Sequence, residues 1–347
     1  MKKRAIAAIV LWGPALLCLA GCGAAHETRA PIAIDLRSQI PEGMGITAVE
    51  VSGDRTRALV EGETAGSGSA AGERRCLVLD LRKGTATPLT DLVPGSKDAG
   101  EAVACGAGLS PDGAYLALGF GGADNTTVQV IDLASGKPAA EFEKPGRRSV
   151  AWAGDRLLLH GNSDYPVLAY DLKTKKLEAL PWYGWILGAD ATGGRLVAYV
   201  GKDPTRKPEK GDENIQAVVT PEGQVLCRLD SGGTSCDRQN PVISRNGKYA
   251  VFIYLRGGHQ DDNSVSTRVV TVDGGAVRDL HPWSYFTALT DRGEPICTWD
   301  DGIMIGRKQW EVLVPKGHAR KGTVVGDEFF YVDEQSRTFK SVALPGG

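Results

Sequence analysis

The chain has 347 residues, of which 42% are hydrophobic, and its 40 basic and 42 acidic residues give a formal net charge of −2 at pH 7. This balance leaves no basic footprint of the kind that nucleic acid requires, so we exclude nucleic acid as a partner. Glycine is abundant, at 45 residues, which indicates many tight turns.

The first 21 residues have the features of a lipoprotein signal peptide. Lys2, Lys3 and Arg4 precede an apolar run over residues 5–20. That run is shorter than the roughly 20 residues of a spanning helix. It ends in Leu19-Ala20-Gly21-Cys22, which resembles the bacterial lipobox, whose cysteine becomes the lipidated first residue of the mature protein. We expect Cys22 to anchor the chain on the extracytoplasmic side of a bacterial membrane. An ordinary cleaved signal peptide is the alternative.

Short β-rich runs separated by Gly, Pro, Asp and Asn fill the rest of the chain, with almost no helical periodicity. One phrase recurs, an apolar strand that ends in Asp and is followed by a Gly- or Lys-containing turn. It occurs at Cys76–Gly84, Val128–Lys137, Val167–Lys176 and Val269–Gly275. From Asp80 to Asp273 is 193 residues, or four steps of about 48. Periods of about 40–50 residues in four-stranded units indicate a β-propeller.

We therefore predict an all-β fold, with residues 32–347 forming a single seven-bladed β-propeller of four-stranded antiparallel blades; six or eight blades are the alternatives. The expected blades cover about 45–92, 102–144, 147–180, 184–230, 240–280, 284–314 and 318–345. The last stretch offers only three strands. The missing outermost strand is expected at Ile32–Leu36, directly after a lipidated tether of residues 22–31, and would close the ring.

The second expected blade carries the clearest resemblance to a known family. Its Ser110-Pro-Asp-Gly-Ala-Tyr-Leu-Ala117 hairpin, followed by a strand ending in Asp132-Leu-Ala-Ser-Gly-Lys137, resembles the repeats of TolB-like and WD-repeat propellers. The fifth blade repeats the hairpin as Ile243–Phe252, with Asn246-Gly247 in the turn. No Gly-His and Trp-Asp pair frames a unit, as strict WD repeats require. The resemblance implies an architecture and says little about activity.

Antiparallel pairing divides the connections of such blades between two faces. We call the face with the turns between first and second and between third and fourth strands the tight-turn face, and the opposite one the long-loop face. Four long insertions fall on the latter, at Gly62–Arg74, Gly121–Thr127, Gly201–Asn214 and Leu255–Ser266. Long loops on a rigid scaffold are where binding usually resides, so we expect function there. Drift in unselected surface loops is the alternative.

Candidate binding residues cluster in three connections of this face. Two lie between blades and are rich in aromatic residues, and the third is one of the long insertions. They contain Trp182, Tyr183 and Trp185; His281, Trp283 and Tyr285; and Arg256, His259, Asp261 and Asp262. The aromatic residues can stack on a sugar or anchor a partner protein, or pack between blades instead. A metal site is conceivable in the charged loop, but its spacing matches no EF-hand or zinc pattern, so we expect no metal and a solvated loop with binding potential.

The cysteines do not indicate a cofactor. Cys227 and Cys236 flank a turn-rich segment, and an oxidising envelope permits a disulfide between them. Two small buried side chains are the alternative. No C-x-x-C pair occurs, which argues against zinc and thioredoxin-like chemistry.

The sequence assigns no catalytic residue, because it contains no G-x-S-x-G elbow and its histidines have no sequence-local nucleophile or base. We predict a monomeric, membrane-anchored module that binds an envelope protein or glycan through the long-loop face. The alternative is a propeller enzyme, a hydrolase or lyase, acting on a sugar, lactone or cell-wall fragment at the axial cavity. Convergent carboxylates or histidines on the axis would favour the enzyme. A plugged axis with an exposed aromatic patch would favour the binding module.

Overall fold

The computed structural model describes residues 31–64, 73–92, 107–121, 126–143, 149–160, 165–209, 215–229, 241–255, 265–275, 277–280, 285–299, 302–307 and 309–346. Residues 31–347 form one compact unit. Apart from the four-residue helix α1 (Leu89–Leu92), the regular structure in these ranges is all β, which confirms the predicted class. None of the helical structure described is long and apolar enough to cross a membrane.

Antiparallel strands that are consecutive in the chain make up the sheets of the described ranges, except that β1 joins the last sheet beside β27. The first sheet contains β2 (Gly45–Val51), β3 (Arg57–Glu63), β4 (Arg74–Asp80) and β5 (Thr85–Pro88). The second contains β6 (Ala107–Leu109), β7 (Tyr115–Gly121), β8 (Thr126–Asp132) and β9 (Lys137–Glu143). A seven-stranded sheet follows, with β10 (Ser149–Ala153), β11 (Arg156–His160), β12 (Pro166–Asp171), β13 (Lys176–Ala189), β14 (Leu196–Val200), β15 (Ile215–Val219) and β16 (Val225–Arg228).

Three further four-stranded sheets complete the described fold. One contains β17 (Val242–Ile243), β18 (Tyr249–Leu255), β19 (Val265–Thr271) and β20 (Val277–Leu280). The next contains β21 (Tyr285–Leu289), β22 (Pro295–Trp299), β23 (Gly302–Gly306) and β24 (Trp310–Pro315). In the last, β1 (Ala33–Asp35) lies at one edge, followed by β27 (Thr338–Ala343), β26 (Glu328–Asp333) and β25 (Gly322–Val325).

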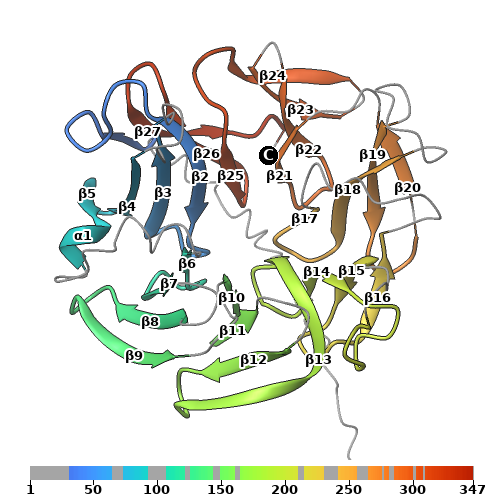
Figure 1. The fold of residues 1–347 in the computed structure, drawn as a ribbon. Coiled ribbons are helices and arrows are strands. Elements are labelled where there is room, and N and C mark those ends of the chain that lie inside the picture. Colours follow the sequence, from blue (N-terminus) through green and yellow to red (C-terminus); the bar gives the residue numbers. More distant parts are fainter. Residues whose placement is uncertain are drawn as a thin grey trace, which may run out of the picture. The chain divides into compact units, whose positions relative to one another are not determined.

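The first strands of neighbouring sheets lie next to one another. β2 contacts β6 on one side and β25 on the other, and further contacts join β6 to β10, β10 to β13, β13 to β17, β17 to β21 and β21 to β25. Figure 1 shows the sheets arranged around a common centre, with these strands innermost. The four long insertions predicted from the sequence all link the second strand of a unit to the third.

The recurrent aspartate of the sequence phrase caps the turn between the third and fourth strands. Asp80 Oδ1 accepts the backbone N–H groups of Arg82 and Lys83, at 3.1 and 3.0 Å. Asp132 does the same for Ala134 and Ser135. Such side-chain-to-backbone bonds offer the chain a turn in place of a continued strand. The phrase therefore marks where each of these strands ends.

One predicted connection is wrong. We predicted a connection between blades at Trp182, Tyr183 and Trp185, but these residues lie inside β13, a continuous strand of 14 residues. Its first half pairs with β12 as far as Tyr183, and its second half pairs with β14 from Gly184 onward. Pro181 has no N–H to donate, but it lies at the register shift between β12 and β13, where no residue of β12 is paired with it. The chain passes from one four-stranded unit to the next without a turn.

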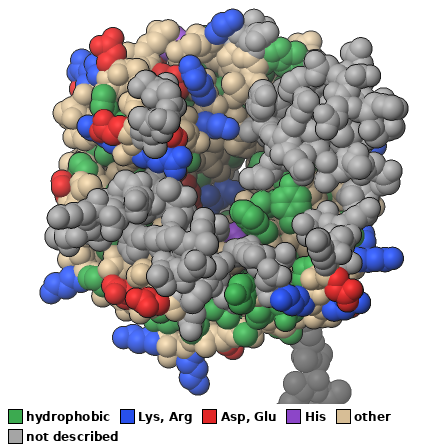
Figure 2. Space-filling model, in the orientation of Figure 1, with side chains coloured by type: hydrophobic (Ala, Val, Ile, Leu, Met, Phe, Trp, Pro, Cys, Tyr) green, Lys and Arg blue, Asp and Glu red, His purple; other side chains and the backbone are tan. Residues whose placement is uncertain are grey.

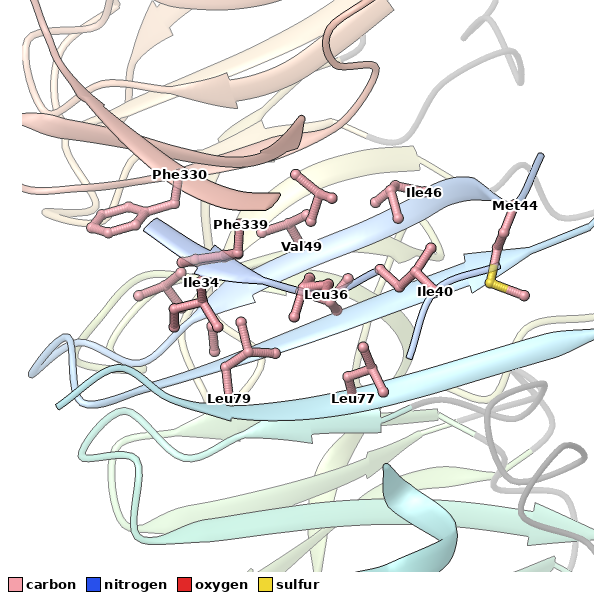
Figure 3. Packing of buried hydrophobic residues seen from close by; sticks show 14 of the residues in the cluster. Ile34, Leu36, Ile40, Met44, Ile46, Val49, Leu77, Leu79, Phe330 and Phe339 are labelled. Atoms are coloured by element: carbon pink, nitrogen blue, oxygen red, sulfur yellow. The ribbon is translucent and has the colours of Figure 1, made fainter. Parts of the chain in front are cut away.

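The N-terminal strand packs where the first and last sheets meet. Ile34 of β1 pairs with Phe339 of β27 in antiparallel register, as predicted for residues 32–36. Ile34 and Leu36 are 4% and 0% exposed and belong to the same apolar cluster as Phe330 and Phe339 (Figure 3). The cluster also takes side chains from β2, β3 and β4, so residues near the two ends of the chain share one core.

Candidate functional site

A cavity of about 330 Å³ lies at the centre of the described sheets, among their first strands. Segments of β2, β6, β10 and β13 form its wall, together with the turns that follow β2, β6, β13 and β17. Figure 2 shows a hollow at the centre of the molecule with a basic side chain and a histidine on its wall. The polar side chains that line the cavity are Glu50, Ser52, Ser110, His160, Asp190 and Arg245.

Arg245 lies across the tight-turn end of this cavity. It belongs to the turn between β17 and β18, and its Nη1 donates to the carbonyl oxygen of Val51 in β2, at 3.3 Å. Its Nη2 comes so close to Gly53 that a Cβ atom added there would lie 2.8 Å away. Burial lowers the pKa of Arg245, although the nearby carboxylates of Asp291 and Glu50 favour its charge.

Glu50 is the carboxyl group that faces Arg245 in this cavity. Its Oε2 accepts the backbone N–H of Leu109 at 3.2 Å. Burial nevertheless raises the pKa of Glu50 to about 7, and the neighbouring carboxylate of Glu61 adds to the rise. A carboxyl group that is half protonated near neutral pH can donate as well as accept a hydrogen bond.

His160 ends β11 and is 3% exposed. Its Nδ1 accepts the backbone N–H of Ile186 at 3.2 Å, so the neutral ring carries its proton on Nε2. Burial lowers the pKa of His160 to about 3, which keeps the ring neutral at physiological pH. The ring therefore supplies one N–H donor to a cavity that it lines.

We expect the stability of the His160→Asn variant to depend less on pH than that of the wild type. Below pH 6.5 the unfolded chain binds a proton at His160 that the folded chain does not bind until about pH 3. The wild type therefore loses stability at this residue as pH falls through that window, by about 2 kcal/mol between pH 7.5 and 5. Urea unfolding of both proteins at these two values measures the difference. Parallel pH curves would contradict the assignment.

The aromatic residues predicted from β13 separate into two roles. Trp182 is fully buried, and its Nε1 donates to the Pro221 carbonyl at 2.7 Å, so it packs in the core. Trp185 is 49% exposed and lines the cavity. Tyr183 is partly buried and does not line the cavity, and its backbone N–H donates to the Pro204 carbonyl at 2.8 Å. Only Trp185 of this group joins the site.

Of the other predicted site residues, Tyr285 and Cys227 lie within the described ranges. Tyr285 is the first residue of β21. The residues outside the described ranges are Cys22, Cys236, Arg256, His259, Asp261, Asp262, His281 and Trp283. Cys227 is a partly buried residue of β16, and the disulfide predicted for it stays a prediction because Cys236 lies outside these ranges.

Glu50, His160 and Arg245 were not among the residues predicted from the sequence. A signal for Arg245 does exist, because the two hairpin phrases read Ser110-Pro111-Asp112-Gly113 and Ser244-Arg245-Asn246-Gly247. The second residue of these turns lies at the end of the cavity in both cases. Arg245 occupies the position that Pro111 has in the other hairpin, so this exchange of proline for arginine is the sequence signal for a charged group at the cavity.

Convergent carboxylates or histidines are the criterion for an enzyme, and a plugged axis with an exposed aromatic patch is the criterion for a binding module. The cavity meets each of them in part. Glu50, Asp190 and His160 converge on it, as an enzyme would require, but Asp190 Oδ1 is engaged by the N–H groups of Thr192 and Gly194. Among the described residues, no group of three His, Cys, Asp or Glu side chains can hold a metal ion. The exposed Trp185 is a single aromatic residue of the kind expected for a binding module, but between the described sheets the cavity leaves the centre open rather than plugged.

Comparison with solved structures identifies the fold. Hydrazine synthase of Kuenenia stuttgartiensis is 14% identical, with a TM-score of 0.54 over 89% of this chain and 98% of that one. The Swd1 β-propeller domain of Myceliophteria thermophila is 12% identical, with a TM-score of 0.52 over 90% and 100%. The β-propeller of the trilobed protease from Pyrococcus furiosus is 11% identical, with a TM-score of 0.54 over 88% and 97%.

These matches confirm the predicted β-propeller fold. No protein-family model matches the chain, and no curated protein matches it in sequence. Because the identities lie far below 25%, they define a class of fold and no activity.

Proposed function

We propose that this chain is an extracytoplasmic lipoprotein whose propeller binds a glycan of the bacterial envelope, with one sugar ring in the axial cavity. The observation that carries the proposal is Trp185, a half-exposed indole that lines the same cavity as Glu50 and His160. An indole face packs against the apolar face of a sugar ring, while buried polar groups bind its hydroxyls. A volume of about 330 Å³ suits a small ligand.

We also propose that the sheets form a complete ring of seven blades. The seven-stranded sheet counts as two blades that share β13, and each other sheet counts as one. Pairing of β1 with β27 gives the last blade its fourth strand, and β2 contacts β25. Seven inner strands would then surround the axis.

A glycan is favoured over a protein partner by the distribution of exposed apolar side chains. A protein interface needs a cluster of large apolar anchors. The large hydrophobic side chains exposed in the described ranges are Tyr165, Trp185 and Val312, of which only Trp185 lines the cavity. A single aromatic platform beside hydrogen-bonding groups fits a sugar better.

The anchor is the part of the proposal that rests on sequence. Lipid on Cys22 would hold the propeller near the membrane, because residues 23–31 reach at most about 30 Å. β1 runs antiparallel to β27, so the tether would enter from the tight-turn face and the long-loop face would point away from the membrane. Mass spectrometry of the N-terminal peptide, which distinguishes a lipidated from a free Cys22, tests this part.

Binding to envelope glycans tests the function. We expect the purified full chain to retain oligosaccharides released from a bacterial envelope, and the Trp185→Ala variant to bind them about tenfold more weakly. Tyr165→Ala is the matched control, because Tyr165 is 47% exposed and lies outside the cavity lining. Equal losses for the two variants, or retention of a protein and no glycan, would overturn the proposal.

Glu50 favours a second candidate, a propeller hydrolase or lyase. A cavity carboxyl group with a pKa of about 7 is suited to general acid–base catalysis. In the same experiment, shortened or unsaturated glycans in the wild-type sample that are missing with Glu50→Gln would support the enzyme.

A further inference from the structure

The tight-turn end of the axial cavity holds a cation, Arg245, that forms no ion pair with the described residues. Val51 O is the single acceptor for the Arg245 guanidinium among the described residues, at the long distance of 3.3 Å, and no carboxylate there forms an ion pair with it. A guanidinium has five N–H donors. Several of them therefore remain for a ligand that enters the cavity.

Among the described residues that line the cavity, Arg245 is the only arginine or lysine. At the equivalent position of the neighbouring turns stand Gly53, Pro111 and Ala191, which line the cavity but carry no charge. Asp291 holds that position one sheet further on, where its Oδ1 accepts the backbone N–H of Asn246 at 2.8 Å. Asp291 therefore hydrogen-bonds to the turn and favours the charge of Arg245 from nearby, without a hydrogen bond or ion pair to its guanidinium.

Resting on the proposed function, we infer that the axial cavity selects a sugar ring that carries a carboxylate, as a uronic acid does, with the carboxylate on Arg245. Planar carboxylate and guanidinium groups form paired hydrogen bonds. The His160 Nε2–H supplies a further donor, and Trp185 offers its ring as a platform for the sugar.

Protonation of Glu50 should make the affinity of this site for an anionic ligand depend on pH. The groups that face it are Arg245, the Leu109 N–H and the Glu61 carboxylate, while Asp190 and His160 line the same cavity. An anionic ligand binds better when Glu50 is protonated, since two negative charges then do not share the cavity. His160 stays neutral in this range, and a uronate stays ionised.

Calorimetric titration of the full chain with glucuronate and with glucose tests the inference. We expect glucuronate to bind about tenfold or more tightly than glucose, from one charge-assisted contact. Arg245→Gln should remove this preference. Lys248→Gln, which removes an exposed positive charge from the same turn, should leave it unchanged.

The pH dependence provides a readout that a purely structural arginine would not change. The affinity of the wild type for glucuronate should rise about tenfold from pH 8 to pH 6, and that for glucose should stay constant. Glu50→Gln should abolish this rise. Glu61→Gln should keep the rise but move it to lower pH, because the Glu61 carboxylate helps raise the pKa of Glu50 and does not itself line the cavity.

The outcomes separate the inference from the proposed function. If glucose binds as tightly as glucuronate and Trp185→Ala weakens both, the inference is wrong and the proposed function stands. If neither sugar binds and no envelope glycan is retained, both are wrong. Should Arg245→Gln fail to fold, the glucuronate-to-glucose ratio and its pH dependence in the wild type still decide.

Discussion

Replacing Trp182 with alanine should lower the free energy of unfolding by about 3–5 kcal/mol, the largest single-residue loss that we expect. The side chain is fully buried in a cluster with Leu180, Ile186 and Val200. Removing it leaves a large cavity and deprives the Pro221 carbonyl of its hydrogen bond from Nε1. Gly223, at a φ of +87°, packs directly on the indole, so this turn loses its contact as well.

Trp185→Ala is the matched control for Trp182. Both residues are tryptophans of β13, but one is buried and the other 49% exposed. Urea unfolding should show a loss of about 1 kcal/mol or less for Trp185→Ala, as is usual for exposed positions. Similar losses for the two variants would contradict the division of β13 into a core residue and a site residue.

Gly193→Ala is the second substitution for which we expect a large loss. Gly193 has a φ of +68°, and a Cβ atom there would lie 2.0 Å from Ala153 Cα and 2.4 Å from the Gly154 nitrogen. These are backbone atoms of the neighbouring unit, so the clash cannot be relieved by a side-chain rotation. Overpacking of this kind costs about 1–3 kcal/mol beyond the conformational cost.

Gly136→Ala separates the cost of overpacking from the cost of the left-handed backbone. Gly136 has a φ of +67°, and nothing lies within 4 Å of its added Cβ. The Gly136→Ala substitution should therefore lower the free energy of unfolding only by the cost of a left-handed backbone, about 1–2 kcal/mol. Thermal or urea unfolding of both variants should show the larger loss at Gly193. Equal losses would mean that the turn between β13 and β14 does not pack against β10 as described.

The repeated local signals explain which parts of the fold could be predicted. Asp80 and Asp132 end their strands because their side chains cap the next turn, a local interaction that sequence displays directly. The pairing of β1 was also predictable, since the last stretch contains only three strands of its own.

The errors and omissions come from non-local effects. Pro181 and Gly184 have the appearance of a loop, but pairing with β12 on one side and β14 on the other keeps the chain extended. Glu50 and His160 come from different sheets, and only the arrangement of those sheets around one centre brings them to the same cavity. Arg245 could have been noticed as the departure from Pro111, but its contact with Val51 could not.

A crystal structure of the protein grown with glucuronate tests the central claim, that the axial cavity is the ligand site. We predict density for one sugar ring in the cavity, with its ring against Trp185 and its carboxylate on Arg245. Glucuronate bound elsewhere on the molecule, with the cavity holding only water, would contradict that claim.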